Sequence, residues 1–420
     1  MMKVRQRFPE SPAVDFARVL RTDLGPLMGG LKPGARIAVA VGSRGISNLR
    51  ALVTAAIETL REAGARPFIV PAMGSHGGGT PEGQLAILTD YGITAEAMGV
   101  PIEATMEVER LGVTSEGFDL CFSTAAWQAD GILVINRIKP HTDFRGNLGS
   151  GLMKMMVVGL GKRAGAANFH SAASRLGYEE IIRSSGRIIL KSAPILAGVA
   201  IIENQRHETA KIAVLRPDEI EGAEESLCAE ARSLMPRLPF KEIDLLIVDR
   251  LGKNISGTGM DPAVIGRSIH GYSLCDELMD GAPKVRRLFV RELTPQSRGN
   301  AIGVGLADFT TSRLVRAIDW GVTTLNALTA HSIQGAKTPI HFETDREVIA
   351  KALGTLALGD SGLAKVVRIA DTLSLEVFEV SEACGPQLEG REDIETLSCP
   401  EAMSFGEDGN LDPFLFPPPG

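Results

Sequence analysis

The stretch that decides the fold is residues 36–64, RIAVAVGSRGISNLRALVTAAIETLREAG. It begins with a compact apolar run over 36–41 and continues through a glycine-containing turn. Apolar residues then recur at helical spacing from Leu49 to Leu60, and Gly64 ends the run. This pattern predicts a buried strand followed by an amphipathic helix, which is the repeating unit of an α/β protein.

The same unit recurs downstream. Residues 66–72 (RPFIVPA) predict a second strand, and the loop after it leads to Thr80, a helix N-cap with Pro81 at the first helical position. Residues 131–136 (GILVIN) predict a third strand, and residues 193–217 predict two adjacent strands. Alternating strands and helices predict mostly parallel sheets covered by helices, so the fold class is α/β.

A chain of 420 residues is long enough for two such domains. We expect an N-terminal α/β domain over 1–220 that binds cofactor and substrate, and a helical linker over 221–240. After the linker we expect a C-terminal α/β domain over 241–400 and an irregular tail over 401–420. Ligands of parallel sheets bind beyond the carboxyl ends of the strands, so we expect the active site in the cleft between the two domains.

Composition excludes several classes of function. The net charge is −7 and there is no basic cluster, which argues against nucleic acid as a partner. No apolar segment reaches the roughly 18–20 residues that a bilayer span needs, and the N-terminus lacks the apolar core of a signal peptide. The five cysteines show no paired spacing. We therefore expect a reduced, cytoplasmic protein without a membrane partner.

Residues 132–173 concentrate chemistry: ILVINRIKPHTDFRGNLGSGLMKMMVVGLGKRAGAANFHSAA. Two of the seven histidines, His141 and His170, flank Lys154, which lies in a Met-rich apolar segment. Burial lowers the pKa of a lysine and suits a nucleophilic or covalently derivatised amine, although a head group that reaches solvent explains the same pattern. His170 suits a metal site only if a cofactor supplies the other donors. His141 is either a site residue or part of a solvated loop.

Two further candidates follow predicted strands. His76, in GSHGGGT, stands at a strand end before a helix, where an imidazole can serve as a general acid or base near neutral pH. Arg44, in VGSRGIS, holds the equivalent position after the first strand, where a guanidinium can grip a carboxylate with two hydrogen bonds. The alternatives are a loop histidine bonded to its own backbone and an ordinary surface arginine.

Taken together, GSHGGGT, PHTDFRGNLGSGLMK and ANFHS resemble the motifs of the lactate racemase family. The resemblance implies that Lys154 is the covalent tether of a nickel-pincer nucleotide (pyridinium-3,5-bisthiocarboxylic acid mononucleotide with nickel). It implies that His170, sixteen residues later, ligates the nickel. His76 and His141 match the acid/base pair of the family, and Arg44 matches the arginine that binds the substrate carboxylate.

The resemblance further implies an isomerase, a racemase or epimerase of a 2-hydroxy acid that acts by reversible hydride transfer to the cofactor. Its implied partners are the 2-hydroxy acid and the enzymes that synthesise the cofactor. VGSRGI lacks the acidic residue and the proline that surround the family arginine, and GSHGGG lacks the Arg-Pro that often follows the family histidine. These changes lie beside the residues that the resemblance assigns to substrate binding. They therefore predict a divergent member that acts on a different 2-hydroxy acid.

Two other functions are compatible with the residues alone. Lys154 suits a pyridoxal-phosphate or other Schiff-base enzyme, with the glycine-rich loops binding phosphate. A non-catalytic paralogue that binds the cofactor without turnover is the second alternative.

Overall fold

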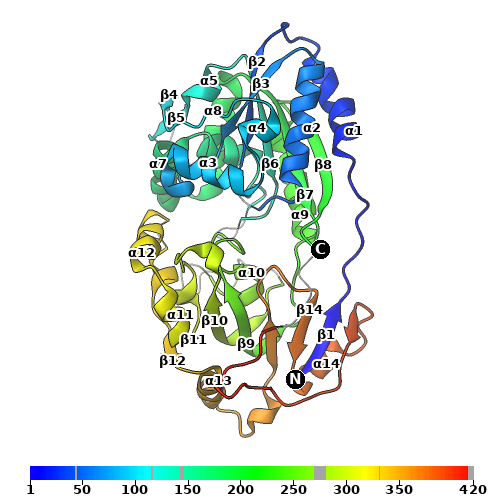
Figure 1. Cartoon of the computed structure of the whole chain (residues 1–420), viewed down its shortest axis with the longest axis vertical. Coiled ribbons are helices and arrows are strands. Elements are labelled where there is room, and N and C mark those ends of the chain that lie inside the picture. Colours follow the sequence, from blue (N-terminus) through cyan, green and yellow to red (C-terminus); the bar gives the residue numbers. More distant parts are fainter. Residues whose placement is uncertain (43–44, 115–116, 142–145, 269–280, 331, 415–420) are drawn as a thin grey trace. The chain divides into compact units, whose positions relative to one another are not determined.

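The computed structural model describes residues 1–42, 45–114, 117–141, 146–268, 281–330 and 332–414. The chain forms two compact units. The N-terminal unit comprises Ser11–Met235, and the C-terminal unit comprises Met1–Glu10 together with Pro236–Gly420. Figure 1 shows both units as sheets packed with helices, which confirms the predicted α/β class. Within the described residues, no helix has the length and apolar character required to cross a membrane.

The N-terminal unit is built on a five-stranded sheet of order β3-β2-β6-β7-β8. The first four strands are parallel, and β8 is antiparallel to β7. A separate hairpin, β4–β5, is also present. The strands are β2 (Arg36–Val41), β3 (Arg66–Pro71), β4 (Val108–Val113), β5 (Asp119–Ser123), β6 (Gly131–Arg137), β7 (Ile195–Glu203) and β8 (Thr209–Leu215).

Helices cover both faces of this sheet. Buried side chains of α2, α3 and α4 form one core, and those of α5 to α9 form the core on the other face. The helices are α1 (Phe16–Val19), α2 (Leu49–Glu62), α3 (Pro81–Asp90), α4 (Ala95–Met98), α5 (Thr124–Trp127), α6 (Leu152–Lys154), α7 (Lys162–Leu176), α8 (Tyr178–Ser192) and α9 (Ile220–Ser233). A π-helical turn, η4 (Met155–Gly159), joins α6 to α7.

The C-terminal unit contains an eight-stranded sheet of order β12-β11-β10-β9-β13-β14-β1-β15. The first five strands are parallel, and the last three pair antiparallel. The strands are β1 (Met2–Gln6), β9 (Glu242–Leu251), β10 (Lys284–Leu293), β11 (Phe309–Thr311), β12 (Ile340–Phe342), β13 (Val366–Ile369), β14 (Val377–Val380) and β15 (Ile394–Thr396). The helices are α10 (Pro262–Ile265), α11 (Ser312–Ala317), α12 (Trp320–Thr329), α13 (Asp345–Gly354) and α14 (Gly385–Leu388).

The unit boundaries differ from those expected from the sequence at both ends of the N-terminal domain. Residues 1–10 lie in the C-terminal unit because β1 pairs with β14 and β15. Helix α9, expected as part of a linker, buries Ile220, Leu227 and Cys228 in the core of the N-terminal unit. The division therefore falls after α9, between residues 235 and 236.

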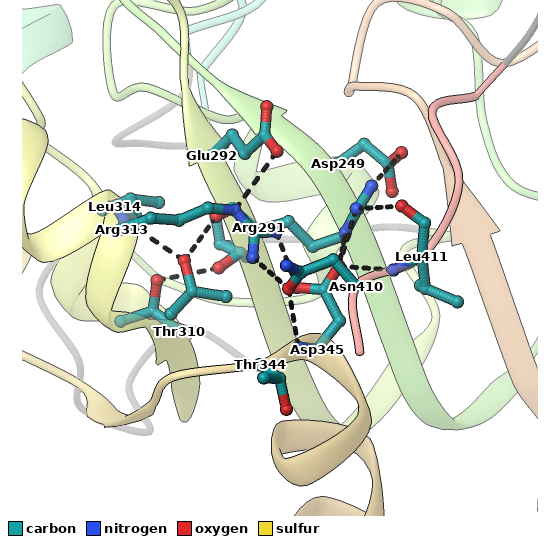
Figure 2. Close-up of polar contacts among 12 residues, drawn as sticks. Asp249, Arg291, Glu292, Thr310, Arg313, Leu314, Thr344, Asp345, Asn410 and Leu411 are labelled. Atoms are coloured by element: carbon teal, nitrogen blue, oxygen red, sulfur yellow. Dashed lines mark hydrogen bonds and ion pairs between the residues drawn. The ribbon is translucent and has the colours of Figure 1, made fainter. Parts of the chain in front are cut away.

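The segment expected as an irregular tail is fixed by buried charges (Figure 2). The Arg291 guanidinium donates to Asp249 (2.6 Å), to Asp345 (2.8 Å) and to the Leu411 carbonyl (2.9 Å). Asp345, fully buried, also accepts from the Leu411 amide (2.9 Å). Leu411 itself is buried in a core cluster. Residues near 411 are thus part of the folded unit, because the buried ions need those backbone groups as partners.

Candidate active site

The carboxyl edge of the N-terminal sheet gathers the loops that carry the candidate residues. Strands β2, β3, β6 and β7 are parallel, so all of them end at this edge. The chain passes from β3 to β6, across β2, which makes the gap between β2 and β6 a topological switch point. Ligands of open α/β sheets bind in the crevice at such a point.

The loop after β2 begins directly beside the lysine-bearing segment. A Cβ on Gly42 would lie 3.2 Å from the Asn136 side-chain oxygen and 3.7 Å from the Met155 methyl group. The Gly45 amide, on the far side of the loop, donates to the Tyr91 hydroxyl (3.0 Å). Arg44 lies outside the described residues, so its predicted contact with a substrate carboxylate stays a prediction.

The His76 loop is fixed by its backbone against the segment that follows Lys154. The Gly74 amide donates to the Gly159 carbonyl (3.0 Å), which ties the loop to η4. From α3, the Gln84 side-chain amide donates to the carbonyls of Gly74 (3.0 Å) and His76 (3.4 Å). Gln84 is fully buried, so these hydrogen bonds fix the loop from its core side. His76 itself is half-buried.

Lys154 ends α6, a short turn that begins opposite the end of β6. The Asn136 side-chain amide donates to the Gly151 carbonyl (2.8 Å), and the backbones of Lys139 and Ser150 exchange two hydrogen bonds (2.8 and 2.7 Å). The side chains on both sides of Lys154 are buried in the core, whereas Lys154 is half-buried. The apolar segment therefore anchors the turn, and the lysine extends from it.

The structure brings three of the predicted residues into one cluster. The Lys154 amine contacts Nε2 of His141. The His141 ring stacks on Tyr178, with centroids 5.8 Å apart and an interplanar angle of 25°. Tyr178 in turn packs edge-on against His170, with centroids 6.4 Å apart. Tyr178 thus links His170, the predicted nickel ligand, to His141, a predicted acid/base residue that contacts Lys154, the predicted tether.

Tyr178 is not among the candidate residues that the sequence singled out. It is the first residue of α8, and Gly177 before it turns the chain out of α7 with a φ of +94°. Phe169 packs against both the His170 and the Tyr178 rings, with centroid distances of 5.4 and 5.9 Å. Gly177, which reverses the chain seven residues after His170, is the one sequence signal for this return.

Two buried ionisable groups near the site were also missed. Lys162 is fully buried, and burial lowers its pKa to about 8. Its amine donates to the Pro71 carbonyl at the end of β3 (2.7 Å). Glu224, on α9, is fully buried, and burial raises the pKa of its carboxyl to about 7 against the lowering effect of hydrogen bonds from the Met153 and Leu152 amides.

The donors present suit a cofactor that brings most of its own metal ligands. Among the described residues, no group of three or more His, Cys, Asp or Glu side chains is placed to hold a metal ion. His170 offers one imidazole, and the amine of Lys154 belongs to the same cluster. One amine and one imidazole fit a lysine-tethered metal cofactor in kind and number.

Comparison with known proteins supports the resemblance seen in the motifs. The model of the lactate racemase N-terminal domain family matches residues 11–179. A crystal structure of a protein from Thermotoga maritima is similar over 88% of this chain and 99% of that chain, with a TM-score of 0.54 and 12% identity. The lactate racemase apoprotein from Thermoanaerobacterium thermosaccharolyticum covers 89% of this chain and 93% of its own, with a TM-score of 0.48 and 14% identity. No curated protein matches significantly.

The fold and the site thus define an α/β protein with its candidate site at the carboxyl edge of a parallel sheet. Residues 11–179 of the N-terminal unit match the model of the lactate racemase N-terminal domain family, in agreement with the resemblance of the motifs. This match supports a lactate racemase-like function.

Proposed function

We propose that the chain is a racemase or epimerase of a 2-hydroxy acid that carries a nickel-pincer nucleotide tethered to Lys154. The observation that carries this proposal is the cluster in which Lys154, His141, Tyr178 and His170 meet at the switch-point edge of the sheet. The match to the lactate racemase N-terminal domain family supports it independently. The partners are then the 2-hydroxy acid and the enzymes that synthesise the cofactor.

Lys154 would hold the cofactor covalently, and His170 would ligate its nickel. When bound, the cofactor supplies an electrophilic carbon that reversibly accepts the Cα hydrogen of the substrate as hydride. This matters because the Cα proton of a 2-hydroxy acid is weakly acidic, so direct deprotonation is slow. The chain itself positions the substrate and moves the hydroxyl proton.

His141 and His76 are the groups proposed to move that proton. One imidazole takes the proton of the substrate hydroxyl, and the other returns a proton when the opposite face is attacked, so the configuration inverts. A positioned acid or base contributes roughly 10²–10⁴-fold to such a step. The His76 loop is held on η4 and His141 contacts Lys154, so both loops flank the turn that carries the tether. Arg44 would bind the substrate carboxylate.

Chiral chromatography over a panel of 2-hydroxy acids tests this function, with protein made alongside the cofactor-synthesis enzymes. We expect inversion of at least one acid, loss of inversion in His76→Ala and His141→Ala, and retention in His341→Ala, a control in the C-terminal unit. An unchanged rate in either site variant contradicts the two-histidine scheme. Nickel binding without any inversion would favour the non-catalytic paralogue, and a borohydride-reducible chromophore without nickel would favour a pyridoxal-phosphate enzyme.

A further inference from the structure

The loop that leads to Lys154 is fixed from α8 and α9. Glu179, on α8, accepts from the Asn147 amide (3.0 Å). Arg232, on α9, donates to the Gly146 carbonyl (2.7 Å). Arg183 joins the two helices, because it bonds Glu179 on α8 and Glu221 on α9 (2.9 Å to Glu221). Helix α9, which the sequence suggested as a linker, therefore supports the segment of the proposed tether.

The turn that carries Lys154 begins without a cap of its own. The first amides of a helix have no acceptor within the helix, and a side chain of the N-cap residue usually satisfies them. The N-cap residue of α6 is Gly151, which has no side chain. The turn is buried, so these amides need an acceptor from elsewhere in the fold.

Glu224 supplies that acceptor from α9. One of its carboxyl oxygens accepts from the Met153 amide (2.9 Å). The other oxygen has no hydrogen-bond partner among the described residues and lies against Gly151. A Cβ at position 151 would lie only 2.1 Å from this oxygen, so the carboxyl occupies the space of the missing side chain. Gly151 has extended backbone (φ −156°, ψ −156°), so backbone conformation does not require glycine there.

Burying a carboxyl is costly unless its hydrogen bonds compensate. Glu224 makes no ion pair among the described residues, although it is completely buried. An apolar residue would fill the same space without that cost. The carboxyl is therefore explained by what it accepts, namely the Met153 amide hydrogen of the lysine-bearing turn.

We propose that Glu224 is the positioning residue of Lys154: from α9 it caps the turn that ends at Lys154 and so fixes where the amine lies. This inference rests on the proposed role of Lys154 for its functional meaning. Its structural content concerns the chain alone and is measurable without the cofactor.

The test compares Glu224→Met, which keeps the approximate volume but removes the acceptor, with Glu224→Gln, which keeps an acceptor oxygen. Glu230→Gln is the matched control, since Glu230 lies on the same helix and bonds Lys211 at the surface (2.7 Å). The readouts, on the full chain without cofactor, are hydrogen exchange of the Met153 amide and the rate at which an acylating reagent labels Lys154.

In Glu224→Met we expect the Met153 amide hydrogen to exchange about tenfold faster, because one hydrogen bond to a charged or polar acceptor is lost. We also expect the rate of Lys154 labelling to change at least about threefold. Glu224→Gln should restore both to within about threefold of the parent protein, which a role in packing alone would not require. Parent-like exchange and labelling in Glu224→Met would overturn the inference.

Gly151→Ala tests the same contact from the opposite side and covers the case in which Glu224→Met does not fold. The added methyl displaces the carboxyl, so the same acceleration at Met153 is expected, and an unchanged exchange rate would overturn the inference. Failure of the proposed function is separate: it would show as a missing cofactor adduct on the parent protein, whatever these variants do.

Discussion

We predict that the effect of Glu224→Gln on the free energy of unfolding depends on pH. Burial raises the pKa of the Glu224 carboxyl from its ordinary 4.5 to about 7. The hydrogen bonds from Met153 and Leu152 and the nearby Arg183 cation oppose this rise, and the Glu221 carboxylate adds to it. Each unit of pKa difference between folded and unfolded states is worth about 1.4 kcal/mol, so the difference here corresponds to about 3 kcal/mol.

The sign follows from which state holds the proton more tightly. The folded-state pKa is raised, so the stability supplied by the neutral carboxyl is fully present below pH 4.5 and is lost as the pH rises to about 7. Glutamine is neutral at every pH. The free energy of unfolding of the parent minus that of Glu224→Gln should therefore fall by about 3 kcal/mol between pH 4.5 and 7 and stay level above it.

The assay can follow one unit at a time, because each unit contains one of the two tryptophans. In a Trp320→Phe background, the fluorescence of Trp127, which packs edge-on against Phe122, reports urea unfolding of the N-terminal unit. A difference between the two proteins that is constant across this pH range would refute the reasoning, because the carboxyl would then titrate alike in both states.

Three other perturbations probe separate parts of the structure. Tyr178→Leu removes the ring that packs against both His141 and His170. The nickel affinity of the cofactor-loaded protein, measured by titration, should therefore fall about two- to tenfold, whereas Tyr178→Phe keeps the ring and most of the affinity. Gln84→Leu leaves the Gly74 and His76 carbonyls without their buried donor. The free energy of unfolding, followed by Trp127 fluorescence, should fall by about 1–3 kcal/mol, and inversion should be slower. Unchanged values in both assays would contradict the role of Gln84 in supporting the His76 loop. Arg291→Met removes the cation that Asp249 and Asp345 share, while Asp249 keeps Arg368 and Asp345 keeps Arg313. The C-terminal unit, followed through its own tryptophan, should then lose about 1.5–3 kcal/mol, and a loss below about 1 kcal/mol would show that the network is dispensable.

The regular parts of the fold were predictable because their signals are local. Periodicity predicts the strand of residues 36–41 and the adjacent strands β7 and β8. Capping chemistry predicts the helix that begins after Thr80, with Pro81 at its first position. The pairing of β1 with β14 was not predictable in this way, because it joins residues more than 370 positions apart. The burial of Leu411 depends on the same kind of distant partner, the buried charges of the C-terminal sheet.

The candidate site shows the same division. Residue type and spacing singled out Lys154, His141 and His170, and the structure joins these three. Tyr178 and Glu224 could not be found from spacing, because an aromatic residue at a helix start and an acidic residue inside a charged helix look ordinary in one dimension. Their roles come from the return of α8 and α9 onto the lysine-bearing turn. The predicted interdomain cleft and the role of Arg44 stay predictions.

The central claim is that Lys154 and His170 hold one nickel-containing cofactor, and intact-mass spectrometry with metal analysis tests it most directly. On protein made alongside the cofactor-synthesis enzymes, we expect an adduct of mononucleotide size together with nickel. The adduct should be lost in Lys154→Ala but kept in Lys191→Ala, a control on the last turn of α8. Nickel should be lost in His170→Ala while the adduct remains. A parent protein with neither adduct nor nickel under these conditions would contradict the account.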